Sequence, residues 1–292
     1  MPGPGNGPGN GPGNRRPGQP PGWLAHDRRG SGAPLVLLHG IGSRWQVWTP
    51  VLDTVARHRD VIAVDLPGFG DSPAEPGVAT VPQLATRVAA FLDALGLDRP
   101  HLAGSSMGGG VALELGRRGA ARSVTAFAPV GFWRTPGRVW AQATVRGARA
   151  LSTALAPVLP RLAARPATRA VLFGTFYGRP GRLDPADCLA DAAALRGATG
   201  FDAACVGFAR WRLTGPAPTV PLGPLAALPV TIAWGTRDVV LPYRPQSGTA
   251  RTALPTARHV TLRGAGHLPF ADDPAGCAHL LSVDWSTTIP GY

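Results

Sequence analysis

The sequence predicts a doubly wound α/β fold, in which a mostly parallel sheet carries helices on both faces and a helical segment is inserted between two strands. Three observations predict it. Short apolar runs recur along the chain, amphipathic helical patterns separate them, and one long stretch contains no strand-like run at all. Short and uniformly apolar runs are typical of strands buried on both faces, as the strands of a parallel sheet are.

Six apolar runs are the candidate strands. They are Leu35–Leu38, Val61–Val64, His101–Ala103, Val124–Phe127, Val230–Trp234 and His259–Leu262. After the second run, Gln83–Leu95 places its large apolar residues on one stripe at helical spacing, and Gly108–Arg118 follows the third run as a short helical pattern. Strands that alternate with helices in this way indicate a parallel sheet wound on both sides.

Two segments fall outside this alternation. Residues 132–220 contain several helix-like pieces punctuated by prolines, and we expect them to form an inserted helical cap. The α/β core is then made of residues 23–131 and 221–292. Residues 1–22 form a low-complexity tail in which GPGN occurs three times from Gly3 to Asn14. We expect this tail to be disordered, because it has no apolar side chains to bury.

Composition excludes several classes of protein. The chain has 292 residues, 44% of them hydrophobic, which is enough for a full core. The net charge of +12 comes entirely from arginine, because the sequence has no lysine, and the arginines are scattered. Nucleic-acid binding proteins cluster their basic residues, so we expect no nucleic-acid partner.

The same survey gives expectations about location and redox state. No apolar run approaches the length of about 20 residues that a membrane helix needs, and no apolar signal segment begins the chain. The cysteines Cys188, Cys205 and Cys277 are widely spaced, which argues against a disulfide framework and a structural zinc site. We therefore expect a cytoplasmic protein with no membrane partner; the sequence leaves its oligomeric state open.

The segment HLAGSSMGGG (101–110) places two serines side by side between glycines. Ser106 is the centre of a G-x-S-x-G pattern, whereas Ser105 has Ala103 and Met107 at the two positions where glycine is required. The pattern is typical of a nucleophile on a sharp strand-to-helix turn, where a side chain two residues away on either side would collide with backbone. The helix that follows directs its N-terminus at the serine and favours negative charge there.

A serine nucleophile needs a general base and a carboxylate to orient that base. His267 ends the glycine-flanked loop GAGH after the last apolar run, at a position where active sites gather in open α/β sheets. Asp238 follows the preceding run in WGTRD. Asp272 is close to His267 in sequence, and Asp273 before Pro274 has the pattern of a helix cap. We choose Asp238, which gives the chain order Ser, Asp, His.

An oxyanion hole completes this arrangement. One donor is the backbone N–H of Met107, the residue after the nucleophile. The second is expected from the loop HGIG (39–42), where Ile41 presents its N–H and His39 shapes the loop.

Taken together, the motifs LVLLHGIG, DLPGFGDS, HLAGSSMGGG, WGTRD and GAGH resemble those of the α/β-hydrolase superfamily, in its cap-bearing serine hydrolase (esterase-like) branch. The resemblance spans Leu35 to Pro274. It implies hydrolysis through an acyl-enzyme, a site with no metal and no cofactor, and a cap that closes over an acyl pocket. Serine at the nucleophile position speaks against the haloalkane dehalogenase and epoxide hydrolase branches. The first edge strand is expected to be missing or shortened, because only Trp23–Arg28 is available for it.

The substrate is less defined by sequence. Residues 131–220 carry twelve arginines and four aspartates, which would suit an anionic substrate or solvated helix faces. Trp45, Trp48 and Trp133 are candidate pocket residues; Trp45 and Trp48 could equally fix the helix that follows them.

The leading hypothesis is a serine hydrolase that acts on a small-molecule carboxylic ester or related acyl compound. The alternatives are carbon–carbon bond or lactone hydrolysis, perhydrolysis or a biosynthetic tailoring step by the same triad. A non-catalytic ligand-binding protein is the remaining possibility.

Overall fold

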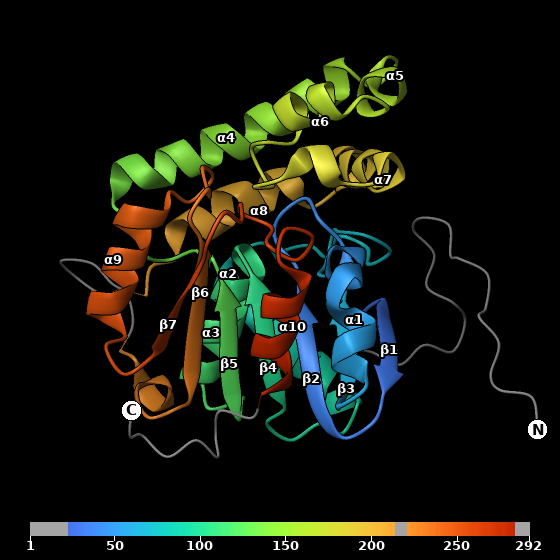
Figure 1. The fold of residues 1–292 in the computed structure, drawn as a ribbon. Coiled ribbons are helices and arrows are strands. Elements are labelled where there is room, and N and C mark those ends of the chain that lie inside the picture. Colours follow the sequence, from blue (N-terminus) through green and yellow to red (C-terminus); the bar gives the residue numbers. More distant parts are fainter. Residues whose placement is uncertain (1–22, 214–220, 284–292) are drawn as a thin grey trace, which may run out of the picture.

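The structure is a computed structural model, and it describes residues 23–213 and 221–283. A seven-stranded sheet forms its centre (Figure 1). The strands are β1 (His26–Gly30), β2 (Ala33–Leu38), β3 (Arg59–Val64), β4 (His101–Ser105), β5 (Ser123–Phe127), β6 (Val230–Gly235) and β7 (Arg258–Leu262). Their order is β1-β3-β2-β4-β5-β6-β7, and every neighbouring pair is parallel except β1 with β3. The six predicted strands and the predicted fold class are confirmed.

The first edge strand is present as a short antiparallel strand. β1 pairs with β3 from His26 opposite Val64 to Gly30 opposite Asp60. Its sequence HDRRG is polar because one side of an edge strand faces solvent, and Arg28 forms an ion pair with Asp60 at 2.7 Å. A search for apolar runs does not find such a strand.

Helices cover both faces of the sheet. The core helices are α1 (Thr49–Ala56), α2 (Val81–Ala94), α3 (Met107–Arg117), α9 (Tyr243–Ala253) and α10 (Pro274–Ser282). Side chains alternate between the faces along each strand: Val36 and Leu38 of β2 pack with α2 and α3, whereas Leu35 and Leu37 pack with α1 and α10. This two-sided burial explains why the inner strands of the sheet are mainly apolar.

A helical insertion lies between β5 and β6 in the sequence. It contains α4 (Thr135–Ala154), α5 (Leu159–Ala163), α6 (Pro166–Leu172), α7 (Pro185–Gly197) and α8 (Phe201–Gly207), with 3-10 turns η2 (Pro180–Arg182) and η3 (Phe208–Arg210). The remaining 3-10 turns are η1 (Trp45–Trp48) and η4 (Gly223–Ala226). Figure 1 shows the inserted helices stacked across one end of the sheet. The last part of the expected cap, 214–220, and the expected disordered tail, 1–22, lie outside the described residues.

No helix in the described ranges is both long and apolar enough to span a bilayer.

Candidate active site

Ser106 occupies the turn between β4 and α3 in a strained backbone conformation. Its φ is 53° and its ψ is −115°, a region that residues other than glycine rarely adopt. A hydrogen bond to the neighbouring strand fixes the turn, because the Ser106 amide donates to the Phe127 carbonyl of β5 at 2.9 Å. Strain of this kind costs about 1–3 kcal/mol and is concentrated at functional sites.

The two glycines of the motif are required by close backbone packing. A Cβ at Gly104 would lie 2.2 Å from the carbonyl oxygen of Gly108, and one at Gly108 would lie 2.2 Å from that of Leu38. Both approaches are far shorter than a van der Waals contact, so no side chain fits at either position. The G-x-S-x-G spacing therefore follows from how tightly this turn packs against β2.

The two adjacent serines have different surroundings. The hydroxyl of Ser105 is fully buried and has no hydrogen-bond partner within the described ranges. Ser106 is 6% exposed and lines a small cavity together with Ile41, Met107 and Trp133. Of the two, Ser106 is the one whose side chain reaches a space that another molecule could enter.

His267 and Asp238 form a buried hydrogen-bonded pair. Asp238 follows β6 and His267 follows β7, so the two neighbouring parallel strands bring both loops to the same edge of the sheet. His267 Nδ1 lies 2.8 Å from Asp238 Oδ2, and the other carboxylate oxygen accepts the Leu241 amide at 2.9 Å. A carboxylate that accepts from Nδ1 leaves Nε2 of the imidazole able to take a proton.

The loop after β2 lies directly against Ser106. A Cβ at Gly40 would be 3.1 Å from the Cβ of Ser106 and 3.7 Å from its Oγ. The hydrogen bonds of the described loops include none from the Ile41 amide. Met107 is the first residue of α3, where backbone N–H groups have no acceptor inside the helix. The hydrogen bonds within the described ranges thus leave the Ile41 and Met107 amides without an acceptor, and their role as an oxyanion hole stays a prediction.

His39 shapes this loop from within the core. The Leu66 amide donates to His39 Nε2 at 3.0 Å, so the proton of the neutral ring is on Nδ1, which donates to the Gly40 carbonyl at 2.7 Å. Burial lowers the pKa of His39 to about 4. Asp65 lies nearby and accepts the Trp45 amide at 2.7 Å; its burial raises its pKa to about 6.

Asp272 connects the loop of His267 to the helical insertion, a role that sequence reasoning missed. Its Oδ2 accepts the amides of Gly178 at 2.7 Å and Gly266 at 2.9 Å, and its Oδ1 accepts the amide of Arg179 at 2.7 Å. In the sequence, its position five residues after His267 was the signal that could have suggested this role. Two of its three partners are backbone amides from a segment more than ninety residues away, which no side-chain pattern reveals.

Asp273 has the separate role expected of it. It caps α10, with its side chain accepting the Gly276 amide at 3.0 Å.

The candidate pocket tryptophans lie in three different places. Trp133 lines the cavity at Ser106. Trp48 does not line any cavity found among the described residues: it is fully buried, with its ring 4.2 Å from that of Phe270. It packs in the core cluster with Val51 and Leu52 of α1, which favours the alternative that it fixes the helix that follows it. Trp45 is half-buried and packs at the edge of the same core cluster, outside those cavities.

The described ranges contain no group of three or more His, Cys, Asp or Glu side chains that could hold a metal ion.

Comparison with known proteins identifies the family of this chain. A model of the alpha/beta hydrolase family matches residues 35–280. A Mycobacterium tuberculosis protein without a functional name is 30% identical over 270 residues, which cover 89% of this chain and 77% of that protein. The pimeloyl-[acyl-carrier protein] methyl ester esterase of Aeromonas hydrophila is 44% identical over 90 residues, 30% of this chain and 34% of the esterase.

The fold has close counterparts among solved structures. A thermophilic esterase from Thermogutta terrifontis superposes with a TM-score of 0.67 at 23% identity, covering 88% of this chain and 90% of the esterase. The family match covers most of the chain, including the loops of Ser106, Asp238 and His267. The chain therefore belongs to the alpha/beta hydrolase family and is an enzyme of the hydrolase type.

Proposed function

We propose that the protein is a serine hydrolase that cleaves a carboxylic ester, or a related acyl compound, through an acyl-enzyme on Ser106. The observation that carries the proposal is the buried hydrogen bond of 2.8 Å between His267 and Asp238, at the same sheet edge as the strained Ser106 turn. The esterase relatives support the reaction class.

The proposed reaction begins with attack of Ser106 Oγ on the acyl carbonyl carbon while His267 Nε2 takes the hydroxyl proton. Asp238 holds the imidazole in the tautomer that allows this and stabilises the imidazolium. The oxygen of the tetrahedral intermediate accepts hydrogen bonds from the N–H groups of Ile41 and Met107. One such donor contributes about 2.7–4 kcal/mol to lowering the barrier.

Collapse of the intermediate breaks the bond to the alcohol oxygen, which receives the proton from His267. A water molecule then attacks the acyl-enzyme while His267 accepts its proton, and the second collapse returns that proton to Ser106 Oγ and releases the carboxylic acid. The helical insertion acts as a cap in this proposal: Trp133 precedes α4 and lines the cavity at Ser106, so it helps to keep bulk water from the acyl-enzyme.

The test uses two variants that differ by one position. Ser106→Ala is expected to lose ester turnover by at least about 10³-fold and to lose labelling by a fluorophosphonate probe. Ser105→Ala is the matched control and should keep both. Activity and labelling are measured on folded protein, verified by circular dichroism, with simple esters and lactones side by side. Full turnover by Ser106→Ala, or an equal loss in both variants, would contradict the proposal. Turnover of lactones alone would favour the lactonase alternative.

A further inference from the structure

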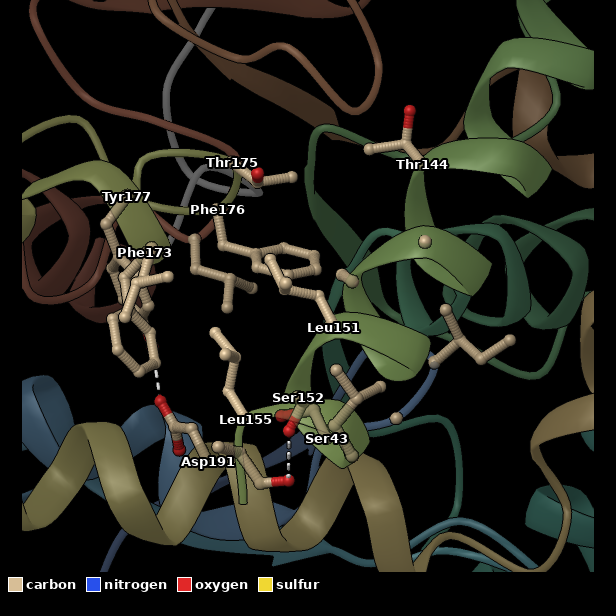
Figure 2. A pocket seen from close by; sticks show the side chains of 18 of the residues that line it. Ser43, Thr144, Leu151, Ser152, Leu155, Phe173, Thr175, Phe176, Tyr177 and Asp191 are labelled. Carbon is tan, nitrogen blue, oxygen red and sulfur yellow. Dashed lines mark hydrogen bonds between the residues drawn. The ribbon is translucent and has the colours of Figure 1, made fainter. Parts of the chain in front are cut away.

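A second, larger cavity of about 320 Å³ lies between the helical insertion and the loop after β2. Its walls come from α4, from α7 and from residues 172–177 of the insertion, together with residues 41–43. Figure 2 shows Leu151, Leu155 and Phe176 gathered around one space, with Tyr177 and Asp191 joined at one side of it. Most of the lining is apolar, and on α4 the lining residues Ala143, Gly147 and Ala148 are small, which leaves room.

This cavity adjoins the candidate active site. Ile41 lines both the large cavity and the small one at Ser106. Phe176, another lining residue, has its ring centroid 6.5 Å from that of His267, and Leu268, the residue after His267, lines the cavity as well. The space at Ser106 is only about 10 Å³, so the greater part of any substrate has to lie elsewhere. The large cavity is the adjoining space that can hold it.

The charges of the lining define what the cavity can accept. Its described lining contains no arginine and no histidine, although the insertion as a whole is rich in arginine. The one lining carboxylate is Asp191, whose Oδ2 accepts the hydroxyl of Tyr177 at 2.5 Å. Burial raises the pKa of Asp191. The hydrogen bond from Tyr177 opposes that rise, and so does the charge of nearby Arg44, which is not part of the lining. The arginine excess therefore does not make this cavity a site for anions.

We propose that the large cavity binds an uncharged, mainly apolar acyl chain of the substrate and that Asp191 accepts a hydrogen bond from a hydroxyl group carried by that chain. The inference rests on the proposed function, because it takes this chain to be the acyl part of the ester that Ser106 attacks. Burial of methylene groups against the apolar walls supplies affinity, at about 0.8 kcal/mol for each group. An ionised carboxylate only accepts hydrogen bonds, so Asp191 selects a donor and repels a second carboxylate.

Substrate preference gives the first test. The p-nitrophenyl esters of acetic, octanoic, 8-hydroxyoctanoic and octanedioic acid (as the monoester) are compared by kcat/KM. We expect octanoate to exceed acetate, and the 8-hydroxy ester to exceed the carboxylate-bearing ester, each by about tenfold or more. Asp191→Asn should reduce the second ratio, because it removes the negative charge. A preference for acetate, or for the carboxylate-bearing ester, would overturn the inference while leaving ester hydrolysis intact.

A pair of glycine variants tests the location. Gly147 of α4 lines the cavity and Gly248 of α9 does not, and a Cβ at either position would meet no atom within 4 Å. A Cβ is therefore accommodated at both positions, and leucine favours a helix more than glycine does. Gly147→Leu should lower the octanoate-to-acetate ratio by about tenfold, because its side chain enters the cavity. Gly248→Leu should keep the ratio of the wild type, and an equal change in both variants would contradict the assignment.

Binding to an inactive protein separates this inference from the proposed function. Octane-1,8-diol and octanedioate are titrated into Ser106→Ala by calorimetry. We expect the diol to bind and the dianion to bind at least about tenfold more weakly, and Gly147→Leu added to Ser106→Ala should weaken diol binding. These results would support the cavity even if no ester were hydrolysed by the wild type. Absence of diol binding, or equal binding of the dianion, would overturn it.

Discussion

Asp272 Oδ2 accepts a hydrogen bond from the amide of Gly266 at 2.9 Å, and Gly266 is the residue directly before His267. The same oxygen accepts the amide of Gly178 in the helical insertion at 2.7 Å. The two glycines are so close that a Cβ at Gly266 would lie 2.6 Å from the nitrogen of Gly178. One buried carboxylate thus fixes the loop of the candidate base to the insertion that covers it.

Replacing Asp272 by asparagine should impair both stability and turnover. An amide has a single acceptor oxygen, so at least one of the backbone N–H groups now bound by the carboxylate loses its acceptor. A buried donor left unsatisfied costs about 1–3 kcal/mol, and we expect the free energy of unfolding in urea to fall by that amount. With His267 less firmly held, kcat should fall by about tenfold while KM changes little, measured well below the unfolding transition.

The neighbouring residue supplies the control for that experiment. Asp273 caps α10 through Gly276. Asparagine caps helices about as well as aspartate, so Asp273→Asn should keep both stability and kcat. If Asp272→Asn kept the full kcat at its reduced stability, the role of Asp272 would be structural only.

The strained backbone at Ser106 should lower the free energy of unfolding, and a substitution that relieves the strain should raise it. Glycine adopts a positive φ without steric cost, whereas alanine does not. Ser106→Gly and Ser106→Ala both lack the hydroxyl and should both be inactive, but the glycine variant should be more stable than the alanine variant by about 1 kcal/mol. The difference is measured as the change in free energy of unfolding. An alanine variant more stable than the glycine variant would show that the turn is not strained.

The hydroxyl of Ser105 should be dispensable for folding. It is buried without a hydrogen-bond partner among the described residues. Removing an unsatisfied buried polar group is nearly neutral or stabilising, so Ser105→Ala should change the free energy of unfolding by no more than about +1 kcal/mol. If Ser105→Ala lowered the free energy of unfolding by more than about 1 kcal/mol, this prediction would be wrong.

The strands of the parallel sheet could be predicted because strands that are buried on both faces have mainly apolar sequences. The runs before Asp65, Gly104 and Gly235 are uniformly apolar, and each is a parallel strand. β1 was harder to find, since an edge strand with a solvent-facing side is polar. The loops of Ser106, Asp238 and His267 could be located for a related reason: each directly follows a recognisable strand.

The remaining parts of the site depend on contacts between distant segments. Sequence could not choose between a site and a core position for Trp48, because the direction of a side chain in a short 3-10 turn has no periodic signature. The amides bound by Asp272 carry no residue-specific pattern. The large cavity arises where α4, α7 and residues 41–43 meet, and the small residues that create it, such as Gly147, resemble ordinary helix residues in sequence.

The buried ring of His39 should make the protein less stable in mild acid. Burial lowers its pKa from an ordinary value of 6.5 to about 4. Below pH 6.5 the unfolded chain binds a proton at this residue that the folded protein does not. The stability contributed by the neutral ring is therefore complete above pH 6.5 and is lost as the pH falls toward 4, by an amount on the order of 3 kcal/mol.

His39→Gln removes the titrating group and keeps an oxygen that can accept the Leu66 amide. We expect this variant to be less stable than the wild type at pH 7.5, where its bond to Gly40 is weakened, but to lose less stability between pH 6.5 and pH 4. Asp65, whose pKa is raised to about 6, contributes in the opposite direction, because the folded protein takes up its proton first. Its carboxylate lies 4.0 Å from His39 Nε2, so the two proteins are compared in an Asp65→Asn background, where the difference between their urea-unfolding free energies across this pH range reports on His39. Parallel pH profiles for the two proteins would contradict the argument.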